Sequence, residues 1–287
     1  LCGRFLCMQS RMEISGLIAM TDERRRLLPG LKVSEGFMRH PFDLEFGVRT
    51  SGLVAGRDLK SGHRHDRHAT AYYGVAPSVF RALIKRWQRS LPGLAIEEVS
   101  FIDVGAGMGR ALLLAAEMPF RRAVGVELNP TLSGIARKNL TVWRSLGRVQ
   151  APVRLVCGDA VEYPLPAGRC LAFLFNPFGA TVMRRLLKSW SKVLATRREI
   201  LDSHPSDKDK HVARVVHPAL QELDLIYVNH EQEHILERQA GFTRLYLGKV
   251  PRSKADAIAD HRILANQPDG EYTSANYEDC SMWRWVG

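Results

Sequence analysis

An apolar run that ends in three alternating glycines occurs at Phe101-Ile102-Asp103-Val104-Gly105-Ala106-Gly107-Met108-Gly109. The apolar part predicts a buried strand over Val99–Val104, and the residues that follow predict a helix over Gly109–Met118. Glycines at such a turn let the backbone bend tightly and approach a ligand closely. The N-terminus of the following helix favours an anionic group. Binders of dinucleotides, phosphates and nucleosides share a turn of this kind, so it indicates a ligand site without identifying the ligand.

Beyond this turn, short apolar runs alternate with longer helical patterns, which is typical of a parallel sheet covered by helices. We therefore predict an α/β protein with a seven-stranded, mostly parallel sheet. Strands three to one should flank one side, and a reversed hairpin should form the far edge. Further strands are expected at Ala123–Leu128, Val153–Cys157, Cys170–Asn176, Leu223–Asn229, Phe242–Val250 and Cys280–Val286, and helices after Ser78, after Asn129, around Met183–Leu194 and at His230–Ala240.

The chain is predicted to contain an irregular N-terminal extension at 1–70 and one domain at 71–287, with a polar insertion at 196–221. The extension is rich in Gly, Arg and His and has no sustained hydrophobic period. Residues 1–20 lack the apolar segment and cleavage site of a secretory signal. No apolar run approaches the ~20 residues that span a bilayer. We therefore expect a cytoplasmic protein with no membrane partner.

The composition, with 45% hydrophobic and 25% charged residues among 287, is that of a globular protein and argues against disorder or a coiled coil. The five cysteines have no disulfide-framework or zinc-site spacing. A formal charge of +11 helps polyanions approach. The helix after Ser78 carries Arg81, Lys85, Arg86 and Arg89 on its polar face. That face either is solvated, the more common case, or contacts phosphates, so nucleic acid stays open as a partner.

Carboxylates stand at the ends of the next two predicted strands. Glu127 ends the second strand and can accept hydrogen bonds from both hydroxyls of a ribose, whereas Asp159 follows the third and can accept one from an adenine amino group. Open α/β sheets bind ligands at these carboxyl ends. Arg110 occupies the position of the third glycine in the dinucleotide fingerprint. The glycine turn and the two acids together predict an adenosine-containing ligand.

With these motifs the sequence resembles the class I S-adenosylmethionine-dependent methyltransferases, which have a Rossmann-like fold, over roughly residues 71–287. The resemblance implies that the turn from Asp103, with Gly105, Ala106, Gly107 and Gly109, holds the methionine part of the cofactor. It further implies that Glu127-Leu128 holds the ribose and Asp159-Ala160 the adenine. NAD(P) binding, or glycines that serve packing alone, are the alternatives.

The fourth strand ends in Asn176-Pro177-Phe178-Gly179, which is similar to the Asn-Pro-Pro-Tyr/Phe motif of amino-group methyltransferases with one proline missing. In that family the Asn side chain and a following carbonyl accept hydrogens from the target amine, and the aromatic ring stacks on it. The resemblance implies these catalytic roles for Asn176, Pro177 and Phe178. Contact of Asn176 with the cofactor, or an ordinary strand-to-helix turn, is the alternative.

Two tyrosines, Tyr72 and Tyr73, stand where such enzymes have a lid over the cofactor, although a pair of packing tyrosines fits equally well. The segment His230-Glu231-Gln232-Glu233-His234 matches a zinc-protease pattern, but no third ligand is evident. The stretch His63–His68 contains arginines that would repel a cation. No metal site is predicted at either place.

The function predicted from the sequence is methyl transfer to a nitrogen of a protein or small molecule. RNA or DNA methylation, and a cofactor-binding module without catalysis, are the alternatives.

Overall fold

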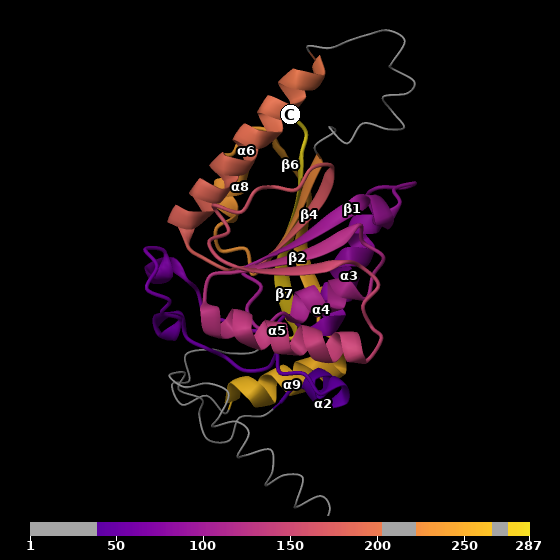
Figure 1. The fold of residues 1–287 in the computed structure, drawn as a ribbon, viewed down its shortest axis with the longest axis vertical. Coiled ribbons are helices and arrows are strands. Elements are labelled where there is room, and N and C mark those ends of the chain that lie inside the picture. The colour runs from indigo at the N-terminus through magenta and orange to yellow at the C-terminus, as the bar shows by residue number, and fades with distance from the viewer. Residues whose placement is uncertain (1–38, 203–221, 266–274) are drawn as a thin grey trace, which may run out of the picture. The chain divides into compact units, whose positions relative to one another are not determined.

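The computed structural model describes residues 39–202, 222–265 and 275–287 (Figure 1). The strands are β1 (Val99–Val104), β2 (Arg122–Glu127), β3 (Val153–Cys157), β4 (Arg169–Phe175), β5 (Glu222–Val228), β6 (Phe242–Pro251) and β7 (Tyr277–Trp285). The helices are α2 (Pro41–Phe46), α3 (Pro77–Arg89), α4 (Arg110–Ala116), α5 (Pro130–Ser145), α6 (Ala180–Asp202), α8 (Glu233–Glu237) and α9 (Lys254–Ala265).

The strands form one seven-stranded sheet in the order β3-β2-β1-β4-β5-β7-β6. The first five strands pair in parallel, whereas β7 is antiparallel to both β5 and β6. This confirms the predicted Rossmann-like α/β class with its antiparallel edge hairpin. The strand order reverses between β1 and β4, and ligands of open α/β sheets bind at such a switch point. Asp103 lies there, paired in register with Gly125 on one side and Phe173 on the other.

Helices cover both faces of the sheet. Apolar side chains of α3, α4 and α5 pack on one face, and those of α6 and α8 pack on the other. Alternate residues of β1 point to opposite sides, so Phe101 joins the first core and Ile102 the second. The central strands are buried on both faces, which explains their nearly continuous apolar sequence.

Several predicted boundaries differ from the structure. Helix α3 begins at Pro77, and Ser78 is not its N-cap; the backbone N–H of Ser78 instead donates to Asp256 of α9 over 2.9 Å. The helix predicted at His230–Ala240 is reduced to α8, because the chain first turns at Asn229, whose φ is +49°. Helix α9 was not predicted at all.

The described part of the predicted extension, residues 39–70, belongs to the same compact unit as the rest. Helix α2 packs the rings of Phe42 and Phe46 against Trp143 of α5, with centroid distances of 5.5 and 5.0 Å. These residues therefore pack together with the part of the chain that follows residue 70. Helix α6 continues through the start of the predicted 196–221 insertion to Asp202. The remainder, 203–221, lies outside the described residues.

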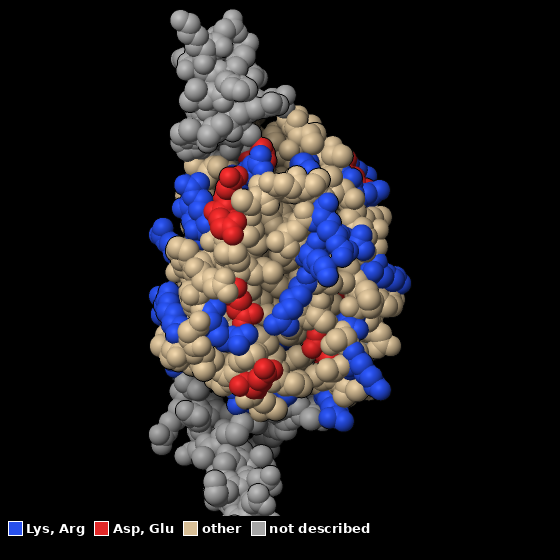
Figure 2. Space-filling view, turned by 90° about the vertical axis from the view of Figure 1, so that its right-hand side faces the viewer, with Lys and Arg blue, Asp and Glu red and all other residues tan. Residues whose placement is uncertain are grey.

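The outer face of α3 carries the basic residues that the sequence placed there. Arg81, Lys85, Arg86 and Arg89 are exposed, and Figure 2 shows Lys and Arg side chains gathered on the side of the molecule where Figure 1 labels this helix. None of the helices in the described ranges is long and apolar enough to cross a bilayer.

Candidate active site

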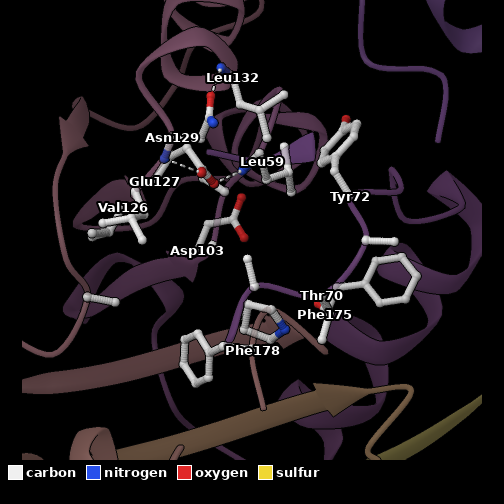
Figure 3. Close-up of a pocket in the computed structure, with 18 of the residues that line it drawn as sticks. Leu59, Thr70, Tyr72, Asp103, Val126, Glu127, Asn129, Leu132, Phe175 and Phe178 are labelled. Carbon is white, nitrogen blue, oxygen red and sulfur yellow. Dashed lines mark hydrogen bonds between the residues drawn. The ribbon is translucent and has the colours of Figure 1, made fainter. Parts of the chain in front are cut away.

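The carboxyl ends of β1 to β4 and the segment before α3 enclose a cavity that opens to solvent (Figure 3). Gly107, Glu127 and Asp159, which the sequence analysis assigned to one ligand, line it together. Two predicted site residues, Gly109 and Asn176, do not line it. The predicted residues that do are Tyr72, Tyr73, Asp103, Gly105, Ala106, Gly107, Glu127, Leu128, Asp159, Ala160, Pro177 and Phe178.

Asp103 is buried at the end of β1, and its carboxylate points into the cavity (Figure 3). The backbone N–H of Leu112 donates to one oxygen over 3.1 Å. No cation pairs with Asp103 among the residues that the structure describes. Burial raises the pKa of Asp103 to about 7; the Leu112 N–H lowers it and the Glu127 carboxylate raises it further. The site therefore contains a carboxylate whose charge lacks a partner within the described chain.

Glu127 holds the glycine turn in addition to lining the cavity. One carboxylate oxygen accepts from the N–H of Gly107 and the other from the N–H of Asn129, each over 2.7 Å. Burial raises the pKa of Glu127, although these backbone donors lower it. A carboxylate has about four acceptor positions, so these bonds leave room for a ligand hydroxyl. This structural role could not be read from the sequence.

The three glycines have different neighbours. A Cβ on Gly105 would lie 2.5 Å from Cβ of Pro177, and one on Gly107 would lie 2.2 Å from the ring of Tyr72; both glycines have positive φ. Gly109 caps α4, and its Cβ would lie 3.1 Å from Cβ of Ala136 on α5. Gly109 thus lies close to α5 and does not line the cavity.

The two candidate lid tyrosines are both anchored through their hydroxyls. Tyr72 donates to the carbonyl of Thr50 over 2.7 Å, and Tyr73 donates to Asp260 of α9 over 2.6 Å. Burial raises the pKa of both phenols. These bonds favour the packing interpretation, while both residues still line the cavity.

The Asn176-Pro177-Phe178 turn lies between two hollows. Pro177 and Phe178 line the cavity, whereas Asn176 lines a neighbouring hollow that shares Thr70 and Phe175 with it. Asn176 has φ +38°, and its side-chain oxygen accepts from the hydroxyl of Tyr227 over 3.2 Å. The carbonyl oxygen of Pro177 accepts from the N–H of Thr70 over 3.4 Å. Both predicted amine acceptors thus already have a partner within the chain.

Arg110 is a site residue whose role the sequence analysis missed. Its buried guanidinium lies 3.9 Å from the buried carboxylate of Asp43 and donates to Thr50 Oγ1 over 2.7 Å and to the carbonyl of Gly74 over 3.0 Å. It therefore fastens two N-terminal segments to α4, where a dinucleotide fingerprint has glycine.

The zinc-protease pattern does not form a metal site in the structure. His230 precedes α8 and pairs with Glu233 over 2.9 Å, so it shares no helix face with His234. The other histidine-rich stretch, His63–His68, does contact a residue that lines the cavity, Asp159. Potential ligand atoms of His63, His65 and Asp159 lie within 4.8 Å of one another, the one such group among the described residues.

The sequence matches no protein-family model and no curated protein. Among solved structures, a proposed RNA methyltransferase from Pyrococcus horikoshii is 13% identical, over 74% of this chain and 83% of that chain, with a TM-score of 0.43. Magnesium protoporphyrin IX methyltransferase from Synechocystis, solved with bound S-adenosylhomocysteine (SAH), is 12% identical, over 73% of this chain and 82% of that chain, with a TM-score of 0.40. The 4+2 cyclase SpnF is 18% identical over 72% and 81%, with a TM-score of 0.44. These are similarities of fold.

Proposed function

We propose that the cavity binds S-adenosylmethionine and that the protein is a methyltransferase. The observation that carries this proposal is the carboxylate of Asp103, buried in the cavity without a cation in the described chain. A ligand that brings its own positive charge compensates such a group. S-adenosylmethionine has an ammonium and a sulfonium, and it supplies an activated methyl group when bound. Asp103 would pair with the ammonium, Glu127 with the ribose and Asp159 with the adenine.

The same electrostatics argue against NAD(P). A dinucleotide would bring its pyrophosphate to the glycine turn, where Asp103 and Glu127 are both buried and would repel it. Arg110 also lines the cavity, but its guanidinium is engaged with Asp43. A cationic adenosine ligand therefore fits these residues better than an anionic one.

We infer that the acceptor is a nitrogen held in the hollow beside Asn176. This hollow adjoins the cofactor cavity through Ala69–Ala71, Tyr73 and Phe175, and it contains Asn229 and Glu231 as further polar groups. The Asn176 oxygen accepts one bond from Tyr227 and retains a second acceptor position. Acceptors on the hydrogens of a nitrogen orient its lone pair in line with the methyl group, which is the main task of such a site.

RNA or DNA is the second candidate acceptor, because of the basic face of α3. Lys85, Arg86 and Arg89 border a small hollow together with Lys249 of β6, and the same region is rich in blue side chains in Figure 2. Phosphate groups could dock there.

Calorimetric titration tests the cofactor. We expect saturable binding of S-adenosylmethionine and S-adenosylhomocysteine and none of NAD(H); the reverse pattern would refute the proposal. Transfer of a labelled methyl group into a cell extract, before and after nuclease or protease treatment, then identifies the acceptor class. Binding without any labelled product would support the cofactor-binding module instead of the enzyme.

The affinity for S-adenosylhomocysteine should depend on pH through Asp103. Its pKa of about 7 means that the free site is largely protonated at pH 6, whereas a bound ammonium favours the carboxylate. Affinity should therefore rise about tenfold from pH 6 to pH 8, with release of a proton on binding at the lower pH. Calorimetry in buffers of different ionisation enthalpy measures both. Asp103→Asn, which can still accept the Leu112 N–H, should bind more weakly and lose this pH dependence; an unchanged profile would remove Asp103 from the site.

A further inference from the structure

His65 and Asp159 face each other at the edge of the cofactor cavity, which both residues line. His65 Nδ1 lies 2.9 Å from Asp159 Oδ2, and the two side chains are only 4% and 6% exposed. Neither atom has another hydrogen-bond partner in the described part of the chain. Two buried lone pairs at this distance repel unless a proton or a cation lies between them.

The position of Arg185 on α6 indicates that a proton, and not a metal cation, lies between His65 and Asp159. Nη1 of Arg185 lies 2.8 Å from Nε2 of His65, and a guanidinium can only donate hydrogen bonds. Nε2 is therefore the acceptor, and in the neutral ring the proton is on Nδ1, facing Asp159. Burial lowers the pKa of His65, which keeps the ring neutral near pH 7.

The loop that carries His65 is itself fixed on both sides. The Asp66 carboxylate accepts backbone N–H bonds from Ser61, Gly62 and His63 over 2.8, 2.8 and 3.1 Å. After the loop, the N–H of Gly179 donates to the carbonyl of His68 over 2.9 Å. These bonds hold the loop in place, so that His65 stays in contact with Asp159, which is far away in the sequence.

We propose that His65 is a positioning residue that holds Asp159 in place to recognise the 6-amino group of the adenine. This inference rests on the proposed function. Asp159 Oδ1 accepts from the N–H of Val161 over 3.0 Å, and the Nδ1–H of His65 occupies one position on Oδ2. The carboxylate then presents its two remaining acceptor positions toward the cavity. With its rotation fixed from both oxygens, Asp159 pays little ordering entropy when adenine binds.

A divalent cation between His63, His65 and Asp159 is the competing possibility, since their potential ligand atoms are close enough. A metal on Nδ1 would move the proton of the neutral ring to Nε2, where it would oppose the Arg185 donor. The contact with Arg185 therefore favours the proton.

The test compares two ligands by calorimetry: S-adenosylhomocysteine and its analogue with hydrogen in place of the 6-amino group. His65→Ala should weaken binding of the first about tenfold, the usual effect of one hydrogen bond to a charged group. The analogue should lose less than about twofold, because it has no amino group to present. Arg64→Ala is the matched control from the same loop, since its side chain is 65% exposed and lies 3.4 Å from the equally exposed Glu162; both affinities should stay at the wild-type values.

Arg185→Leu is a second variant, at an exposed residue, which tests the proposal even if the His65→Ala protein does not fold. It should weaken S-adenosylhomocysteine binding about threefold and leave the analogue unaffected. Equal losses for both ligands, or no loss for either, would overturn the positioning role. A rise in melting temperature with Zn²⁺ that His65→Ala abolishes would replace the proton with a metal. Failure of the wild-type protein to bind either ligand would instead refute the proposed function.

Discussion

Replacing Arg110 by Met should lower the free energy of unfolding by about 3–5 kcal/mol, the usual cost of removing one partner of a buried ion pair. The substitution leaves the Asp43 carboxylate, which is 0% exposed, without its cation. It also removes the donors to the carbonyls of Gly74 and Val75. Denaturant titration measures the loss. The affinity for S-adenosylhomocysteine should fall as well, because residues 72–75 form part of the cavity wall.

The controls for Arg110 separate charge from packing. Arg89→Ala removes an exposed arginine at the end of α3 and should change stability by less than about 0.5 kcal/mol. The double variant Arg110→Met/Asp43→Asn has neither charge of this buried pair, so part of the lost free energy of unfolding should be recovered. If the free energy of unfolding of Arg110→Met lies within about 1 kcal/mol of the wild-type value, the N-terminal segments are held by their other contacts, such as those of α2 with Trp143.

The sheet and the cavity acids could be predicted because their signals are local. Strands β1 to β5 are short apolar runs between helical patterns, and parallel order follows from that alternation. The ends of parallel strands meet at one edge, so Asp103, Glu127 and Asp159 had to lie near each other. No longer-range information was required to bring these three residues together.

Helix α9 could not be predicted because its buried face mixes carboxylates with apolar residues. Asp256 and Asp260, one helical turn apart, are buried there and bind the N–H of Ser78 and the hydroxyl of Tyr73. Buried carboxylates at these positions interrupt the apolar period on which a helix prediction depends. Ser78 and Tyr73 are more than a hundred residues away, so these two compensating interactions are invisible in the local sequence.

The same reasoning explains why residues 39–70 looked irregular. Their order comes from hydrogen bonds to distant groups, such as the bond from the N–H of Arg49 to Asn139 over 2.8 Å and the Arg110 contacts. The contact between His65 and Asp159 could not be predicted for this reason, because His65 lies on a loop that has no hydrophobic period. A sequence pattern records periodicity along the chain, whereas these contacts depend on the finished fold.

Gly107→Ala should have an effect comparable to that of Arg110→Met. Gly107 has φ +55°, and an added Cβ would lie 2.2 Å from Cε2 of Tyr72. The ring cannot swing away freely, since its hydroxyl is bound to the carbonyl of Thr50. The left-handed backbone and the overpacking together should cost about 2–5 kcal/mol of unfolding free energy. Displacement of the turn from Glu127 should also weaken S-adenosylhomocysteine binding, as measured by calorimetry.

Gly134→Ala is the matched control for this substitution. Gly134 lies within α5, and nothing surrounds its Cβ position within 4 Å, so alanine should stabilise the helix by up to about 1 kcal/mol. Adding Tyr72→Ala to Gly107→Ala removes the clash but keeps the backbone strain. Compared with Tyr72→Ala alone, unchanged affinity in this double variant would assign the loss to the tyrosine ring, and a further fall in affinity would assign it to the backbone. A Gly107→Ala protein as stable as Gly134→Ala would show that the turn does not require glycine, which would contradict the close packing on which the site depends.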